Sequence, residues 1–217
     1  MTDKTAAVDP RLYEFLAEVY QGELNRDAVA RLSQILASIP PVADANQAQP
    51  LRLLEQTLEQ IAAEPEKQLL LLGIEYTNLF RGTGPRPVYL YEAVQRSEEG
   101  LMYEGPYFEV RACYETTGFA AAAGTAPEDH LAVELRYVSF LDGQIEQARA
   151  QQDFDQETWI KAQRESFLRE HLLQWVPPCS AALMANAELA FYRQAGELTQ
   201  AVCAQLYTQI NAPAENG

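Results

Sequence analysis

Apolar side chains recur at intervals of three and four residues along most of this 217-residue chain. That spacing places them on one face of an α-helix, whereas strands need a period of two, and no such alternation bounded by hairpin turns is found. The sequence therefore predicts an all-α protein with a single helical-bundle domain of about eight to ten helices over residues 1–217. The first apolar stripe consists of Leu12, Phe15, Leu16, Val19 and Tyr20.

Short polar residues, prolines and glycines predict where individual helices begin and end. The helix after Pro65 is predicted to end at Phe80, before Gly82, and the helix after Pro106 to end at Thr117, before Gly118. The same signals predict helices that begin after Asp9 and after Asn25, and three helices with Pro50, Pro65 or Pro106 in the first turn. A long helix is predicted to begin with the capping-box pattern of 125–128. Three more helices are predicted at 154–175, 178–194 and 197–210.

Residues 81–105 lack this periodicity and are rich in glycine and proline. A loop of that length is unusual in a compact helical domain and is often functional. A second connector, residues 119–125, consists mainly of small residues, and residues 211–217 have the composition of a flexible tail.

Acidic side chains outnumber basic ones by 31 to 16, which gives a formal net charge of -15. Nucleic-acid binding needs clustered lysine and arginine, and no such cluster is found, so a nucleic-acid partner is not predicted. A basic or cationic amphipathic partner suits this charge, although solubility explains an acidic surface equally well.

Cysteine and histidine are few: three cysteines lie far apart without C-x-x-C spacing, and there are two histidines. Neither a disulfide framework nor a metal site is predicted. The N-terminus has no signal-peptide pattern, and no apolar run approaches the roughly 20 residues of a membrane span. These features predict a cytoplasmic protein that is not inserted in a membrane.

The motifs of common enzymes are also missing, including G-x-S-x-G and the phosphate-binding G-x-x-x-x-G-K-[ST]. The chain is therefore not predicted to be an enzyme. The enzyme alternative requires Asp129 and His130 to act as an acid–base pair in a pocket, for example on a nucleotide.

Four segments nevertheless have unusual composition, and each has an ordinary structural explanation beside a functional one. Residues 76–82 fit the buried end of an apolar helix with a glycine cap, and residues 91–106 fit a solvated acidic loop. Acidic residues in 127–130 complement a helix dipole, and Trp175 in 171–177 fits a helix junction.

The order and spacing of these segments resemble the TorD/DmsD/NarJ family of redox-enzyme maturation chaperones, over nearly the whole chain. The resemblance rests on an aromatic-x-x-Leu-Phe-x-Gly segment at 76–82, the loop from 91 to 105, Pro-x-Asp-His at 127–130 followed by Glu134-Leu135, His-Leu-Leu-x-Trp at 171–175, and residues 191–198. The family often has tryptophan where this chain has Tyr76, and an acidic residue where it has Ala126.

The resemblance implies an all-α, cytoplasmic chaperone that is not itself an enzyme. Its partners would be the twin-arginine leader and the apo catalytic subunit of a molybdopterin-dependent reductase of the dimethyl-sulfoxide or trimethylamine-oxide class, held until cofactor insertion is complete. No resident cofactor is implied, although weak guanine-nucleotide binding is a family trait, and the chain would be a monomer or a helix-exchanged dimer. The implied leader-binding residues are Tyr76, Leu79, Phe80, Gly105, Pro127, Asp129 and His130, together with Tyr20.

A twin-arginine leader combines two guanidinium groups with an apolar stretch, so its site needs an apolar groove with carboxylates at the rim. Tyr76, Leu79 and Phe80 are predicted to line that groove. The arginines would meet Asp129 together with Glu98, Glu99 or Glu104. An alternative within the family is a NarJ-like assembly factor for a membrane-associated reductase that is not exported.

Overall fold

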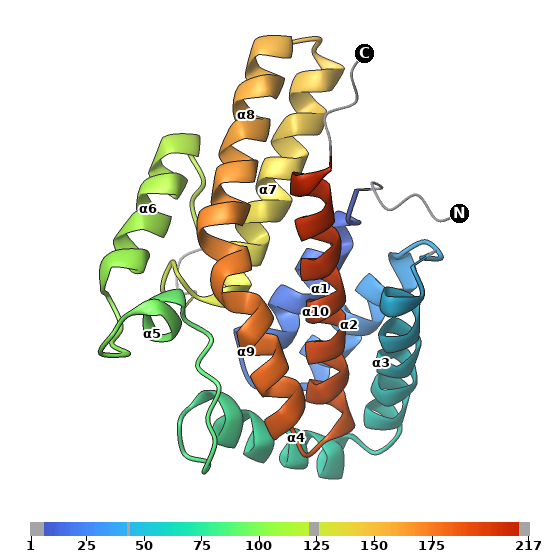
Figure 1. The fold of residues 1–217 in the computed structure, drawn as a ribbon. Helices are drawn as coiled ribbons and strands as arrows, with labels where there is room; N and C mark the ends of the chain where they lie inside the picture. The colour runs from blue at the N-terminus through green and yellow to red at the C-terminus, as the bar shows by residue number, and fades with distance from the viewer. Residues whose placement is uncertain (1–6, 43, 122–125, 213–217) are drawn as a thin grey trace.

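Helices dominate the computed structural model, which describes residues 7–42, 44–121 and 126–212 (Figure 1). No β-strand occurs within these ranges, where one isolated antiparallel bridge joins Tyr91 and His130. The predicted all-α fold is therefore confirmed. The helices are α1 (Pro10–Gln21), α2 (Arg26–Ser38), α3 (Ala45–Ala63), α4 (Pro65–Phe80), α5 (Glu92–Arg96), α6 (Gly105–Thr117), α7 (Leu131–Ala150), α8 (Phe154–Phe167), the π-helical segment η1 (Leu168–Leu172), α9 (Leu173–Asn186) and α10 (Ala190–Asn211).

Several helix ends agree with the capping residues identified in the sequence. The Asp9 side chain accepts a hydrogen bond from the Arg11 N–H (3.0 Å), and Asn25 accepts one from the Ala28 N–H (2.8 Å). Gly118 ends α6 in the left-handed conformation (φ 75°), which glycine adopts without the steric cost of a Cβ. These local signals determine where α1, α2 and α6 begin or end.

The predicted start of the third helix at Pro50 is wrong. α3 begins at Ala45, because the Asp44 side chain accepts a hydrogen bond from the Asn46 N–H (2.9 Å) and the intervening alanine and glutamine residues tolerate helical geometry. Pro50 is buried inside α3, where its missing N–H leaves the carbonyl of Asn46 without the usual helical donor.

The predicted start of the long helix at 125–128 is also wrong, and Thr125 itself lies outside the described residues. α7 begins at Leu131, because the preceding backbone pairs with the loop instead of winding into a helix. The Glu92 N–H donates to the Asp129 carbonyl (2.9 Å), and the Leu131 N–H donates to the Leu90 carbonyl (2.9 Å). Residues 90–92 and 129–131 are thereby held side by side.

The C-terminal helices break at different places from those predicted. The π-helical segment joins α8 to α9, and Pro177 and Pro178 lie in the second turn of α9 instead of ending a helix. The chain turns at 187–189, and α10 then continues through Gly196. A Cβ on Gly196 would lie 2.9 Å from the Met184 Cγ, so this glycine allows α9 and α10 to pack closely.

Two further predictions concern irregular segments. The loop 81–105 contains the short helix α5, which the sequence does not predict because five residues show too little periodicity. Residues 122–125 of the predicted linker and 213–217 of the predicted tail lie outside the described residues, and α10 extends through Asn211, the first residue assigned to that tail.

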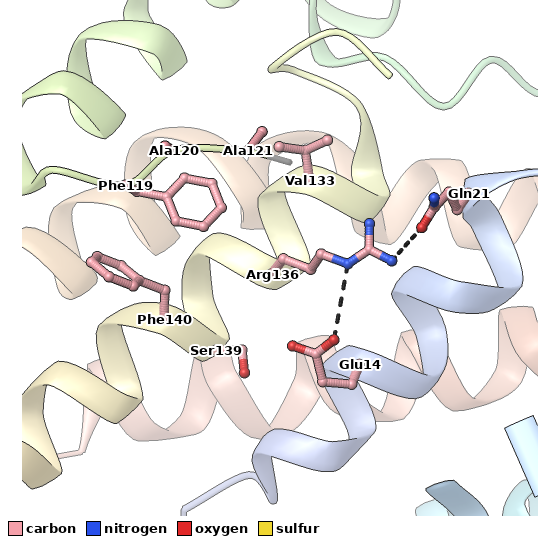
Figure 2. A pocket seen from close by; sticks show the side chains of 9 residues that line it. All are labelled: Glu14, Gln21, Phe119, Ala120, Ala121, Val133, Arg136, Ser139 and Phe140. Carbon is pink, nitrogen blue, oxygen red and sulfur yellow. Dashed lines mark hydrogen bonds and ion pairs between the residues drawn. The ribbon is translucent and has the colours of Figure 1, made fainter. Parts of the chain in front are cut away.

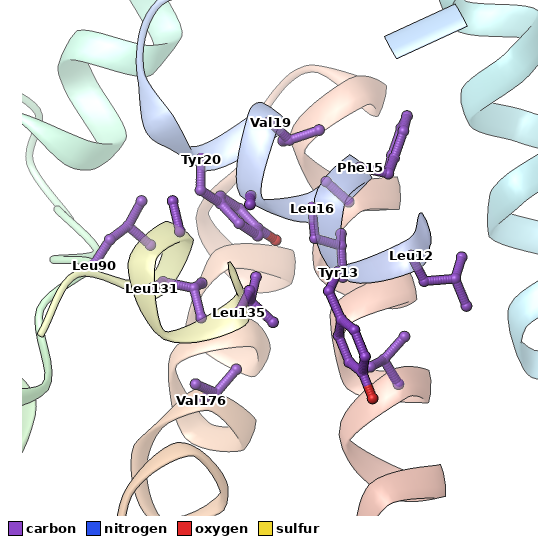
Figure 3. Close-up of a cluster of buried hydrophobic side chains, with 14 of the residues drawn as sticks. Leu12, Tyr13, Phe15, Leu16, Val19, Tyr20, Leu90, Leu131, Leu135 and Val176 are labelled. Carbon is purple, nitrogen blue, oxygen red and sulfur yellow. The ribbon is translucent and has the colours of Figure 1, made fainter. Parts of the chain in front are cut away.

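The core forms around α1, whose apolar stripe packs against α7 and α2, while α10 packs against α9 and α3 (Figure 1). Side chains of α1 meet Leu131 and Leu135 of α7 and Val176 of α9 in one cluster, which Leu90 from the long loop joins (Figure 3). None of the helices in the described part of the chain has the length and apolar character needed to cross a bilayer.

Candidate functional site

An aromatic cluster forms where the end of α4 meets α1 and α10. The rings of Tyr76 and Phe80 are 5.0 Å apart, and Phe80 also contacts Tyr20 (6.2 Å) and Tyr192 (5.5 Å) edge to face. The Tyr76 hydroxyl donates to the Tyr20 carbonyl (3.3 Å). The structure therefore brings Tyr20, Tyr76 and Phe80 together. All three side chains are buried, so they pack beneath the surface of the protein.

The end of α4 is also tied to the long loop. The Val88 N–H donates to the Leu79 carbonyl (2.6 Å), which returns the loop to the helix that it left. The Arg81 guanidinium lies 5.9 Å from the centre of the Tyr76 ring, where a cation is attracted by the ring face. Burial raises the pKa of Tyr76 to about 12, so its hydroxyl remains protonated at neutral pH.

Asp129 caps α5 instead of facing solvent. Its Oδ2 accepts the Ala93 N–H (3.0 Å), and the residue is 1% exposed. Burial raises the pKa of Asp129, while the hydrogen bond from Ala93 acts in the opposite direction. The cap occupies one oxygen of this carboxylate, and the contact of Asp129 with a leader arginine stays a prediction.

His130 caps a different helix. Its Nδ1 accepts the Ala132 N–H (3.1 Å) at the start of α7, and its ring packs edge to face on Tyr91 (5.0 Å). Burial, with the positive charges of Arg136 and Arg81, lowers the pKa of His130 to about 4. The imidazole is therefore neutral at pH 7, and its Nδ1 is engaged by the start of α7.

Two predicted site residues are less closely connected to this region. The Pro127 carbonyl accepts the His130 N–H (3.0 Å), so Pro127 shapes the turn that positions His130. Gly105 is the first residue of α6, which packs mainly on α5 and α8. The structure thus brings Tyr20, Tyr76 and Phe80 into one cluster and Pro127, Asp129 and His130 into another, with Leu79 and Arg81 at the end of α4 and Gly105 on a separate helix.

A buried polar network lies beneath the loop, and sequence analysis did not predict it. His171 Nδ1 lies 3.1 Å from both carboxylate oxygens of Glu92, and Arg96 pairs with the same carboxylate. The Trp175 N–H donates to Glu134 Oε2 (3.1 Å). Glu92 and Glu134 are fully buried, so they depend on these partners.

Protonation in this network follows from burial and pairing. Burial alone would lower the pKa of His171, but its contacts with Cys113 and Glu92 outweigh burial and raise that pKa to about 9. Burial raises the pKa of Glu134 well above its usual range, and the charge of Glu92 acts in the same direction. An imidazolium therefore stands opposite Glu92 at pH 7, and Glu134 tends to remain protonated.

A sequence signal for this network did exist. His171 and Trp175 are four residues apart and so point to the same side of the chain, and Glu134 follows His130 by the same interval. The segment 91–106 fitted a solvated acidic loop, yet the structure buries Glu92 completely. Single-sequence patterns do not separate a buried carboxylate from an exposed one.

A cavity of about 550 Å³ lies elsewhere, between α1, α7 and residues 119–121 (Figure 2). Arg136 crosses it, pairing with Glu14 (3.9 Å) and donating a hydrogen bond to Gln21 (Figure 2). Phe119 and Phe140 form its apolar wall. None of the predicted leader-binding residues lines this cavity, so it does not belong to the predicted site.

Comparison with known proteins places this helical bundle among redox-enzyme assembly proteins. The family model described as nitrate reductase delta subunit matches residues 42–181, more than half of the chain. The protein therefore belongs to the nitrate reductase delta subunit family, and the resemblance to TorD/DmsD/NarJ-type chaperones is confirmed.

Similar proteins include chaperones named TorD. The TorD of Vibrio vulnificus (strain YJ016) is 24% identical over 199 residues, covering 88% of this chain and 89% of that protein. The TorD of Photobacterium profundum is 24% identical over 156 residues, covering 71% of this chain and 70% of that protein. A crystal structure from Archaeoglobus fulgidus, assigned as a redox enzyme maturation protein, shares the fold with a TM-score of 0.57 at 17% identity, covering 93% of this chain and 98% of that one.

Proposed function

We propose that this protein is a cytoplasmic chaperone of molybdoenzyme maturation, which binds the twin-arginine leader and the apo catalytic subunit of a molybdopterin-dependent reductase. Its membership of the family and its similarity to TorD chaperones over most of both chains support the chaperone role. Binding of the leader would delay export until the client has folded around its cofactor. The chaperone acts by binding and catalyses no reaction.

The observation that carries this proposal is the exposed surface of the long loop. Leu101, Met102 and Tyr103 are 51%, 39% and 55% exposed, and Glu98 and Glu99 are exposed next to them. Exposed apolar side chains grouped on a loop indicate an interaction surface, and neighbouring carboxylates suit a cationic partner. A leader with two arginines and an apolar stretch matches that combination.

The buried residues of the site act by holding this surface in place. Tyr76 and Phe80 anchor the helix from which the loop leaves, while Asp129 and His130 cap α5 and α7 at the point where residues 90–92 pair with 129–131. Gly105 ends the loop where α6 begins. We assign these residues to the leader-binding site as its support, and the exposed loop as its contact surface.

Calorimetric titration with a synthetic twin-arginine leader tests the proposal. Met102→Ser combined with Leu101→Ser should weaken binding by roughly tenfold or more, since burying each apolar side chain contributes about 1.5–3 kcal/mol. Phe154→Ser is a matched control, because Phe154 is 69% exposed on α8. Unchanged leader affinity in the Leu101→Ser, Met102→Ser variant would refute the proposed contact surface. No binding of the leader by the wild-type protein would refute the proposed function.

Identifying the client distinguishes the two branches of the family. Purification of the tagged protein from its native host should recover a catalytic subunit that still carries its leader. Recovery of a leaderless catalytic subunit alone would instead favour a NarJ-like assembly factor for a reductase that is not exported.

The non-enzymatic assignment has its own test. Cys113 Sγ lies 3.9 Å from His171 Nε2, and His171 also contacts Glu92, an order of groups that thiol enzymes use. In this protein we expect the thiol to be dispensable. Cys113→Ser should leave leader binding and client maturation unchanged, and loss of client maturation with intact binding would contradict a purely binding role.

A further inference from the structure

A small groove lies between α4, residues 85 and 86 of the long loop, and the turn at 186–189 before α10. Its cavity is about 160 Å³, and its apolar lining comes from Leu71, Ile74 and Leu79 of α4 and from Leu189 at the start of α10. Leu79 is a predicted leader-binding residue, so this groove adjoins the proposed site. α4 itself lies at the lower edge of the bundle in Figure 1.

One carboxylate in this groove is only half satisfied. Glu75 Oε1 accepts the backbone N–H groups of Glu188 and Leu189 (2.9 Å for Leu189), which holds the side chain against the turn before α10. Oε2 is buried and has no hydrogen-bond partner among the residues that the structure describes, and the whole residue is 7% exposed. Buried polar groups in native proteins are nearly always paired, so an unpaired oxygen at a groove indicates a donor that arrives from outside.

Nearby cations do not supply that donor. Arg193 donates instead to the carbonyls of Ala187 (2.8 Å) and Glu188 (3.2 Å), and the structure records no ion pair between Glu75 and any lysine or arginine of the described residues. Burial raises the pKa of Glu75, while the two backbone N–H groups counteract this effect. A bound guanidinium would complete the hydrogen bonding of the carboxylate and stabilise its charged form.

The face of α4 beside the groove is apolar and exposed. Leu70, Leu71 and Ile74 are 65%, 40% and 52% exposed, and they lie within about one and a half helical turns of Glu75. An apolar helix face next to an unpaired carboxylate fits a segment that carries a cation beside apolar side chains. The exposed glutamates of the loop attract the same kind of segment, but exposed pairs are screened by water and salt.

We infer that Glu75 accepts a guanidinium of the twin-arginine leader and that Leu70, Leu71 and Ile74 contact apolar residues next to that arginine, in addition to those that contact the loop. This inference rests on the proposed function and specifies a carboxylate that receives one of the two arginines. Glu75 is the acceptor because it is preorganised by α10 and removed from water, so that a charge-assisted hydrogen bond there is not weakened by solvent.

The test titrates three proteins, wild type, Glu75→Gln and Glu59→Gln, with a leader peptide and with the same peptide carrying glutamine in place of both arginines. Glu75→Gln should weaken binding of the arginine peptide roughly 10- to 100-fold, the range for a hydrogen bond to a charged group. Glutamine retains an oxygen for the Glu188 and Leu189 N–H groups, so the fold should persist in thermal melts. Glu59→Gln is the charge-matched control, because Glu59 is exposed on α3.

The two peptides separate the charge contact from the apolar one. The arginine-free peptide should bind wild type and Glu75→Gln equally. If Glu75→Gln fails to fold, Ile74→Gln replaces it, since this exposed side chain can change without disturbing the core, and it should weaken both peptides.

Each contrary result has a distinct meaning. Equal binding of the arginine peptide by wild type and Glu75→Gln overturns this inference but leaves the proposed function in place. No binding of any leader by the wild-type protein refutes both. If Ile74→Gln converts a dimer to a monomer without changing leader affinity, the α4 face is a contact between two copies and the inference is overturned.

Discussion

Replacing His171 with glutamine should remove much of the pH dependence of stability on the alkaline side of neutrality. His171 is nearly fully buried against Glu92, and these contacts with Cys113 and Glu92 raise its pKa from 6.5 to about 9. A base whose pKa is higher in the folded state stabilises that state fully below its unfolded pKa. The stabilisation is therefore complete below pH 6.5 and is lost as the pH rises through about 9.

The size of the effect follows from the shift. One pKa unit corresponds to about 1.4 kcal/mol, so the free energy of unfolding should fall by about 3 kcal/mol across this range in the wild-type protein. The side chain is only 5% exposed, so solvent screening reduces this value little. Glu134 adds a slope of the same sign, because burial raises its pKa, and that part should persist in the variant.

Urea unfolding followed by circular dichroism at pH values from 6.5 to 9 measures this slope, and NMR titration of the imidazole signals gives the pKa directly. The chain has two histidines, so His130→Gln is a natural control. Burial lowers the pKa of His130 to about 4, so its contribution is present above pH 6.5 and lost as the pH falls through about 4. If the free energy of unfolding changes with pH between 6.5 and 9 in the same way in the wild-type protein and in His171→Gln, the argument for a buried imidazolium is refuted.

Three further substitutions test the support of the site. Phe80→Ala should lower the free energy of unfolding by roughly 3–5 kcal/mol and weaken leader binding, because a buried aromatic at the end of α4 is removed; thermal melts that match wild type would contradict its core role. Asp129→Asn should increase hydrogen exchange in α5 more than elsewhere, since the charged cap on the Ala93 N–H is lost; unchanged exchange would show that the cap contributes little. Trp175→Phe should lower the free energy of unfolding by about 1–3 kcal/mol, because Glu134 Oε2 loses its hydrogen-bond donor. Equal stability of this variant and the wild-type protein in denaturant titrations would indicate that water replaces the indole N–H.

The fold class and several helix ends could be read directly from the sequence. Apolar periodicity and caps such as Asp9, Asn25 and Gly118 are local properties, which act through residues only a few positions away. The family motifs likewise indicated the family, which the family model over residues 42–181 confirms. Where a local signal met a competing tertiary contact, as at 126–130, the tertiary contact determined the structure, because residues 129 and 131 pair with the loop and the helix begins only at Leu131.

Burial and pairing of charged groups were decided only by the tertiary structure. Asp129 and Glu75 are both acidic residues that the pattern alone would leave at the surface, yet one caps α5 and the other faces a groove with one oxygen unpaired. The sequence determined that this chain forms helices and where most of them lie, because helix formation depends on near neighbours. Which carboxylates are desolvated, and which remain able to accept a partner, depends on contacts between residues as far apart as Glu75 and Leu189, and those exist only once the helices have packed.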